Sequence, residues 1–284
     1  MEKLKQNRAL SFVIVGLVYL AATVLGIAIY KSLSFEWWLN LLISDVAATV
    51  FTFVFSLIFK NASVYDPYWS VQPIVILAAY SVGREVNLFG LLLIATVVFW
   101  GIRLTVNWAY TFKNLCHQDW RYTMLKEKTG KLYFFVNLTG IHLVPTLIVW
   151  GCVLPAVYAL VNGIELRAVS LPFIALSFFA ALLQLVSDIQ MHKYRRDRKT
   201  PFICYGIWKY SRHPNYLGEI LMWWGIGLAV VSAAPEAYIL LSGAIANTIL
   251  FLFVSIPMAD GRQSSKEGFA EYKKATRMLL PIKK

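Results

Sequence analysis

Long apolar segments are the feature that most constrains how this chain folds. Eight of them are predicted to cross a membrane as helices, near residues 9–30, 37–59, 67–82, 86–102, 132–160, 168–190, 217–232 and 236–259. A membrane-spanning helix needs about 20 apolar residues. Only 15% of the residues are charged, whereas a soluble domain carries roughly a quarter. The sequence therefore predicts an all-α, polytopic transmembrane helix bundle of about eight spans, within a range of about seven to ten.

Lysine and arginine are distributed unevenly between the loops. With eight spans, 24 of the 27 basic residues fall in the two terminal segments and in alternate loops, and 3 fall in the other loops. Cytoplasmic segments carry such an excess, so both termini are predicted to be cytoplasmic. This pattern also accounts for the net charge of +12, and no nucleic-acid partner is expected. The apolar run 9–30 exceeds the core of a cleavable signal, so we expect it to remain as the first span.

Polar residues inside apolar segments are candidates for function because the bilayer makes them costly. Gln184, Ser187 and Asp188 share one face of the predicted sixth span, since they are spaced three and four residues apart. That face could meet a ligand, or Asp188 could pair with a basic neighbour at the membrane surface. Asp45 and His142 are weaker candidates, and packing explains them as well as ligand binding does.

The densest polar motif runs from Gly206 to Glu219 and follows the basic run from Arg195 to Lys199. The basic run could anchor the chain to anionic lipid, or its arginines could grip phosphate oxygens. Pro214 fits the first turn of the seventh span. Glu219 would then lie about one turn inside, where a buried carboxylate needs a partner. We expect a basic residue or a ligand group to fill that role.

The cysteines do not indicate a metal site. Cys116, Cys152 and Cys204 are isolated, and no CxxC pair is present. We therefore predict no metal ligand. No repeat or linker indicates a second domain, so residues 1–284 are predicted to form one integral-membrane domain.

Several motifs together carry a resemblance to a known family. They are Asn61–Ser70, Trp100–Leu104, Asp119–Tyr122, Asp188–Gln190, Arg212–Glu219, Pro257, Glu271–Tyr272 and Pro281. In these the chain resembles the steroid 5α-reductase superfamily, in particular its prokaryote-rich 5α-reductase-like branch, from about residue 60 to the end. Two places depart from the family pattern. Asp260 stands where a glutamate is common, and Lys199–Phe202 replaces a stretch rich in glycine and asparagine.

The resemblance implies an NADPH-dependent reductase that acts on CH–CH groups, like 3-oxo-5α-steroid 4-dehydrogenases. The cofactor would bind within about residues 168–284. Arg195, Arg196, Arg212 and Arg262 would neutralise its phosphates, and Asp188, Asn215 and Glu219 would hold its amide and ribose hydroxyls. Tyr216 or Trp208 would lie against a ring. His213 and Tyr272 complete the implied cofactor set.

A hydrogen-bond donor is also expected, because reduction of a conjugated enone places negative charge on the carbonyl oxygen. The candidates are Tyr68 paired with Asp66, and Tyr122 paired with Asp119. Relatives place such donors in the N-terminal half, which favours Tyr68. The alternative for Tyr68 is an interfacial aromatic belt. The substrate would be a steroid-like or other lipophilic molecule that enters from the bilayer.

Two other functions fit parts of the same pattern. An S-adenosylmethionine-dependent methyltransferase of the isoprenylcysteine type shares an Arg-His-Pro-x-Tyr element, here Arg212–Tyr216, but Met258–Arg262 lacks the glutamate pair of that family. A non-catalytic lipid-binding protein would have the same helices, although loss of the basic and polar set would be expected. A transporter is disfavoured because no inverted repeat is visible. We expect a bacterial cytoplasmic membrane with the cofactor site on the cytoplasmic side.

Overall fold

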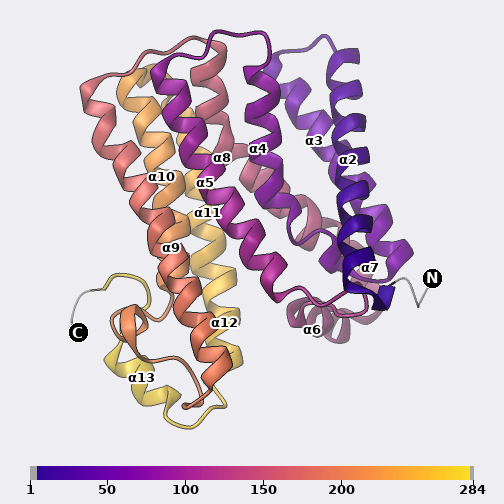
Figure 1. Cartoon of the computed structure of the whole chain (residues 1–284), viewed down its shortest axis with the longest axis vertical. Coiled ribbons are helices and arrows are strands. Elements are labelled where there is room, and N and C mark those ends of the chain that lie inside the picture. The colour runs from indigo at the N-terminus through magenta and orange to yellow at the C-terminus, as the bar shows by residue number, and fades with distance from the viewer. Residues whose placement is uncertain (1–4, 282–284) are drawn as a thin grey trace. The chain divides into compact units, whose positions relative to one another are not determined.

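The computed structural model describes residues 5–281, which contain helices and no β-strand. The α-helices are α2 (Arg8–Ser32), α3 (Trp37–Phe59), α4 (Tyr68–Ser81), α5 (Leu88–Thr111), α6 (Trp120–Thr129), α7 (Tyr133–Val136), α8 (Val144–Val161), α9 (Leu171–Asp197), α10 (Pro214–Ala233), α11 (Ser242–Leu250), α12 (Ile256–Gln263) and α13 (Phe269–Ala275) (Figure 1). Short 3₁₀ turns cover Ala62–Val64, Gly130–Leu132, Ala168–Ser170, Gly206–Lys209 and Pro235–Leu241. Two π-helical turns cover Asn137–Leu143 and Phe251–Ser255.

Seven helical segments within residues 5–281 are long and apolar enough to cross a membrane. They are Arg8–Ser32, Trp37–Phe59, Leu88–Thr111, Trp120–Val161, Ala168–Asp197, Pro214–Ala233 and Pro235–Gln263. The prediction of an all-α polytopic membrane protein with about eight spans is confirmed. The predicted third span corresponds to α4, which has 14 residues with Pro73 inside it. At 1.5 Å per residue α4 is roughly 21 Å long, and is shorter than a hydrocarbon core of about 30 Å.

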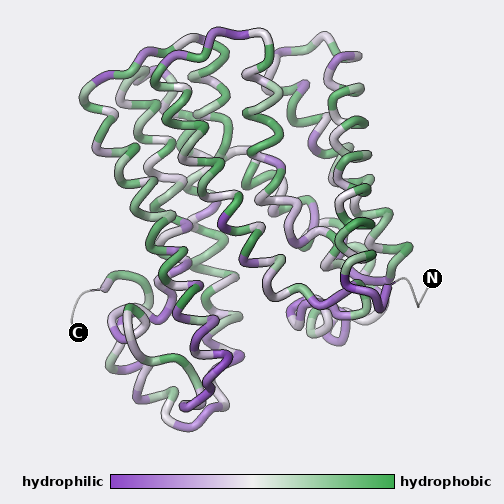
Figure 2. Tube along the Cα trace, viewed as in Figure 1, coloured by the Kyte–Doolittle hydropathy of each residue, from purple (hydrophilic) through white to green (hydrophobic). Residues whose placement is uncertain are grey.

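The remaining spans differ from their predicted bounds for local reasons. The span that contains Pro145 and Pro155 includes the π-helical turn Asn137–Leu143 just before Pro145, and Pro155 lies inside α8. The sixth span continues to Asp197 as part of α9. The C-terminal end of α9 is polar, and Figure 2 shows the change from hydrophobic to hydrophilic residues along that helix. Pro214 occupies the first turn of α10, as predicted.

The chain divides into two compact units, each built from two stretches of sequence. Unit 1 contains the chain up to Ala79 and Gly101–Trp150, and unit 2 contains Tyr80–Trp100 and the chain from Gly151 onward. All the predicted cofactor residues therefore belong to unit 2, and Asp66, Tyr68 and Tyr122 belong to unit 1.

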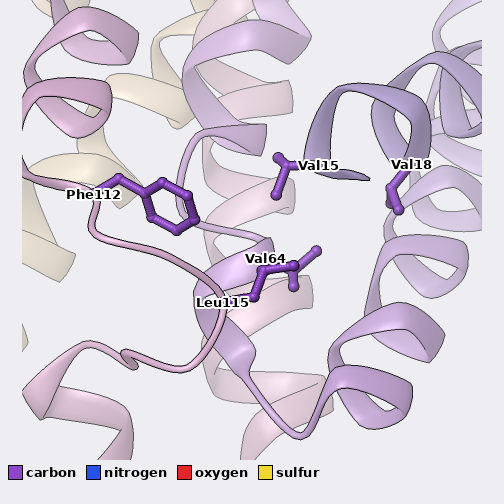
Figure 3. Packing of buried hydrophobic residues seen from close by; sticks show 5 residues of the cluster. All are labelled: Val15, Val18, Val64, Phe112 and Leu115. Carbon is purple, nitrogen blue, oxygen red and sulfur yellow. The ribbon is translucent and has the colours of Figure 1, made fainter. Parts of the chain in front are cut away.

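In unit 1, the segment after α5 packs against the first helices. Val15 and Val18 of α2 belong to one buried cluster with Val64, Phe112 and Leu115 (Figure 3). The Asn61 side chain donates to the Leu115 carbonyl at 2.6 Å. The Asp119 amide donates to Ser63 Oγ at 2.9 Å. These contacts hold the loop before α4 against the loop before α6. Other α2 side chains such as Leu17 and Leu20 are about 60% exposed, as expected for a lipid-facing helix.

In unit 2, α9 and α10 lie side by side over much of their length. Two glycines of α10 make this close approach possible. A Cβ atom on Gly218 would lie 2.6 Å from the Ala180 carbonyl oxygen, and one on Gly225 would lie 2.6 Å from the Phe173 carbonyl oxygen. Neither backbone carbonyl can move aside cheaply, so the packing requires glycine at both positions.

Candidate functional site

Glu219 is buried and accepts hydrogen bonds from two indoles and a side-chain amide. The Trp223 indole N–H donates to Oε1 at 2.9 Å, and the Trp100 indole N–H donates to Oε2 at 2.8 Å. The Gln184 side-chain amide also donates to Oε2, at 3.1 Å. Glu219 is only 5% exposed, so its carboxylate does not face lipid. We expected a basic residue or a ligand group here, and among the groups that contact the carboxylate inside the helix bundle are two indoles and an amide.

Asp260 is the centre of a second polar cluster, at the start of α10. Arg212 Nη2 lies 3.0 Å from Asp260 Oδ2, and His213 Nε2 lies 2.9 Å from Oδ1. Lys273 Nζ lies 3.4 Å from Oδ2. The side chains of Asp260, Arg212 and His213 are each less than 10% exposed. The aspartate gathers three basic side chains from two segments, Arg212 and His213 just before α10 and Lys273 of α13.

Arg212 also holds the C-terminal segment in place. Its Nη1 donates to the Thr276 carbonyl at 2.6 Å, and its backbone amide donates to the Arg277 carbonyl at 3.0 Å. Ser211 and Arg277 form an isolated β-bridge. The arginine predicted to neutralise cofactor phosphate is therefore engaged with protein groups in this structure, and it positions the segment that follows α12.

Cations gather at the same end of unit 2 on α9, α12 and the turn that follows α12. Burial lowers the pKa of Lys266, and the positive charges of Arg262 and Arg198 lower it further. Such an effect requires the three cations to lie close together. Arg195, Arg196 and Arg262 are exposed. We call Arg198, Arg262 and Lys266 the cationic cluster. A concentration of positive charge that depresses a lysine pKa is suited to bind a polyanion.

Aromatic side chains within and near the Gly206–Glu219 motif contact one another and the backbone. The His213 and Tyr216 rings stack with centroids 5.3 Å apart and planes 6° apart. The Tyr272 hydroxyl donates to the Trp208 carbonyl. Trp208 is buried, and its indole Nε1 has no hydrogen-bond partner within the described residues. A buried donor without a partner is a place where a ligand acceptor could bind.

The remaining predicted cofactor residues are partly exposed in unit 2. Asp188 on α9 and Asn215 on α10 are both half-buried. Gln190, two residues after Asp188, accepts a hydrogen bond from the Ile207 amide at 3.0 Å. The Asp-x-Gln motif therefore ties α9 to the loop that carries the Arg212 motif.

In unit 1 the tyrosines bond to other aspartates than those expected. The Tyr68 hydroxyl donates to Asp45 Oδ1 at 3.1 Å, and the Gln72 amide donates to Oδ2 of the same aspartate. Asp66 instead accepts a hydrogen bond of 2.6 Å from the Tyr122 hydroxyl. Asp119 is paired with Arg121, at 2.8 Å. The predicted pairings of Tyr68 with Asp66 and of Tyr122 with Asp119 were wrong, because the helix turn beginning at Tyr68 directs its ring toward α3.

The half-buried Asp66 predicts a pH dependence of stability. Burial raises the pKa of this carboxyl to about 6, and the nearby Asp119 acts in the same direction, while Arg121 opposes it. The folded protein then binds this proton more tightly than the unfolded chain, whose aspartate pKa is about 3.9. The associated stability is complete below about pH 4 and is lost as the pH rises to about 6.

We therefore expect the melting temperature in detergent to carry a component that falls between about pH 4 and pH 6 and that is absent in Asp66→Asn. Thermal melts of the two proteins across this range measure it, and their difference removes other titrating groups. Parallel curves for the two proteins would show that Asp66 does not titrate in this window.

Several residues with prominent contacts were missed or ranked low from the sequence. Asp45 was a weak candidate, and Trp100, Gln184 and Asp260 had no assigned partner. Arg198 lies in the basic run, but Lys266 gave no signal. Across residues 5–281, no group of three or more His, Cys, Asp or Glu side chains is arranged to hold a metal ion.

The comparisons with known proteins bear on the family alone. The family model described as "Protein of unknown function (DUF1295)" matches residues 52–276. No curated protein and no solved structure matches the chain. The matched range includes Tyr68, the residues around Glu219 and the Asp260 cluster. It covers most of the 284 residues. The chain therefore belongs to the DUF1295 family, whose function is unknown.

Proposed function

We propose that this protein is an NADPH-dependent membrane reductase that saturates a carbon–carbon double bond, conjugated to a carbonyl, in a steroid-like or other lipophilic substrate. The cationic cluster carries the proposal, because a concentration of positive charge would attract the phosphates of NADPH. The similarity of the motifs to steroid 5α-reductases supports the same reaction class.

The cofactor proposal follows from the charges in unit 2. NADPH carries a pyrophosphate and a 2′-phosphate, and arginine binds phosphate oxygens with paired N–H donors. Arg198, Arg262 and Lys266 would meet these phosphates, with Arg195 and Arg196 nearby in sequence. The 2′-phosphate is the group that NADH lacks, so this cluster would favour NADPH. The Trp208 indole N–H offers a further donor for an oxygen of the cofactor.

The roles of Arg212 and Glu219 change in this proposal. Their contacts with protein groups indicate that they shape the site by fixing α10, the C-terminal segment and the indoles around Glu219. They are positioning residues rather than direct phosphate or hydroxyl ligands. Asn215, Tyr216 and Asp188, which are half-buried, remain candidates for direct contact.

The chemical step needs a donor for the carbonyl oxygen, and Tyr68 supplies one. Bound NADPH would supply the hydride for the β-carbon of the enone. The Tyr68 hydroxyl donates to the buried Asp45 and would turn toward the substrate oxygen, since a hydrogen bond to a developing oxyanion is strong inside an apolar helix bundle. Tyr122 with Asp66 is the second donor candidate.

Cofactor binding tests the proposal directly. We expect NADPH to raise the melting temperature of the purified protein in detergent more than NADH does. The dissociation constant for NADPH should lie in the micromolar range, which corresponds to a binding free energy of about −8 kcal/mol. At 100 times the dissociation constant, the stabilisation amounts to about 2.7 kcal/mol. Replacing Arg198 and Lys266 together by glutamine should weaken NADPH binding by at least about tenfold, since each charged hydrogen bond contributes about 1.5–3 kcal/mol.

Lys126→Gln is the matched control, because Lys126 is an exposed cation of unit 1. S-adenosylmethionine is titrated in parallel. Stabilisation by S-adenosylmethionine and not by NADPH would move the assignment to a methyltransferase, whose sulfonium cofactor does not gain from a cationic cluster. Stabilisation by neither would favour the non-catalytic lipid-binding protein. The positive-inside pattern supports a site on the cytoplasmic face of the membrane, and we propose that this is a bacterial inner membrane.

A further inference from the structure

Two segments that lie far apart in the sequence meet at the polar end of unit 2. Lys209 and Tyr210 come just before α10, and Arg277 and Met278 follow α13. The two segments are joined by the β-bridge between Ser211 and Arg277. The Ser211 hydroxyl also donates to the Met278 carbonyl at 3.4 Å. In Figure 1 this part of the chain lies beyond the polar end of α9.

The side chains on the outer side of this junction are exposed. Tyr210 is 56% exposed, Met278 37% and Leu280 55%. Lys209 and Arg277 are exposed as well. Within the described residues, neither cation forms an ion pair and the Tyr210 hydroxyl has no hydrogen-bond partner. We call these five residues the C-terminal patch. A surface of this kind, which mixes apolar groups with positive charge, suits a partner that offers both apolar contact and negative charge.

The charge of the surrounding chain also favours an anionic partner. Residues 199–213 and 264–281 together contain seven lysines and arginines, and their acidic residues are two glutamates, Glu267 and Glu271. Such an excess of positive charge attracts anions over a distance set by the ionic strength. A second copy of this chain would bring the same cations and would be repelled.

The position of Tyr210 in the chain brings the patch close to a membrane. Four residues later, Pro214 begins a helix that is long and apolar enough to span a bilayer. Four residues reach at most about 14 Å. The headgroup layer extends about 5–8 Å beyond the hydrocarbon core, and attraction between charges extends about 8 Å further at physiological ionic strength. The patch therefore lies within reach of the lipid headgroups.

We propose that the C-terminal patch is a binding site for anionic phospholipid in the leaflet next to it. Lys209 and Arg277 bind the headgroup phosphate. Tyr210, Met278 and Leu280 enter the interfacial layer, where tyrosine and apolar side chains flanked by cations are favoured. This site shares no residue with the cationic cluster and does not depend on the proposed reductase function.

Hydrogen–deuterium exchange of the full-length protein in nanodiscs tests the proposal. One set of nanodiscs contains phosphatidylcholine alone, and the other contains equal parts of phosphatidylcholine and phosphatidylglycerol. We expect backbone amides in residues 205–211 and 274–281 to exchange more slowly when phosphatidylglycerol is present. The difference should disappear in 1 M salt, where the Debye length falls to about 3 Å.

The double variant Lys209→Gln/Arg277→Gln should lose this protection. Its affinity for phosphatidylglycerol, measured in a neutral detergent by native mass spectrometry, should fall by about 25-fold, since each basic residue near an anionic lipid surface contributes about fivefold. The substitutions keep the backbone hydrogen bonds of the bridge, so the melting temperature in the same detergent should match the wild type.

Lys126→Gln/Lys128→Gln is the matched control, because both lysines are exposed cations of α6 in unit 1. It should keep the protection. Equal loss in the control would overturn the proposal, because only the overall charge of the protein would then matter. Equal exchange in the two lipid mixtures would overturn it as well. Protection in phosphatidylcholine alone, together with the mass of a dimer, would assign the patch to a second copy instead.

Discussion

Tyr68→Phe is expected to lower kcat for enone reduction by about 100-fold while NADPH binds with unchanged affinity. Removing one oxyanion donor costs about 10²–10³ in rate in other enzymes. The substitution deletes only the hydroxyl that donates to Asp45, and the ring can keep its stacking on Tyr65, whose centroid lies 5.2 Å away. The cationic cluster belongs to unit 2, so the loss should appear in kcat and not in cofactor affinity.

Single-turnover measurements with NADPH separate the chemical step from binding. Tyr19→Phe is the matched control, because Tyr19 packs on Tyr68 but donates its hydroxyl to the Val64 carbonyl at 2.7 Å. This control should turn over at the wild-type rate. Full activity in Tyr68→Phe would move the donor elsewhere, and Tyr122→Phe would be the next variant to measure.

Asp260→Asn is expected to destabilise the C-terminal segment strongly. The substitution leaves the buried Arg212 guanidinium without its counter-charge, and breaking a buried ion pair in this way costs about 3–5 kcal/mol. For a chain of this size that corresponds to a fall in melting temperature of roughly 10 °C. Limited proteolysis should also show earlier cleavage after Gln263, where the segment that Arg212 holds begins.

Glu267→Gln provides the comparison for that experiment, because Glu267 lies exposed in the same segment and loses the same formal charge. It should melt and resist protease like the wild type. Equal melting temperatures for Asp260→Asn and Glu267→Gln would mean that the Asp260 cluster contributes little to stability. NADPH affinity of Asp260→Asn should fall as well, since the cations around the site lose their fixed positions.

Much of the helix layout is predictable from the sequence, because a membrane imposes a length and an apolar composition on each span. Pro214 at the start of α10 could be placed from its missing N–H alone. The length of α4 was harder to predict. A run of apolar residues does not show whether the helix within it is long enough to span the membrane. The extension of α9 to Asp197 reflects helix formers that continue past the apolar residues.

The candidate site was predictable as a set of residues and not as a set of contacts. Glu219 was recognised as a buried carboxylate, yet its partners Trp100 and Gln184 lie 119 and 35 residues away in the sequence. The pairing of Tyr68 with Asp45 was missed for the same reason: sequence proximity to Asp66 was a poor guide once α3 packed beside α4. Only the tertiary arrangement decides which donor reaches which carboxylate.

The glycine positions of α10 have a mechanical consequence. Gly218 and Gly225 lie seven residues apart on one stripe, and each sits under a backbone oxygen of α9. Sliding either helix by a turn would drive a side chain into a main-chain carbonyl. The two helices are therefore expected to move together as one rigid pair, so a displacement of the polar end of α9 would also displace the start of α10.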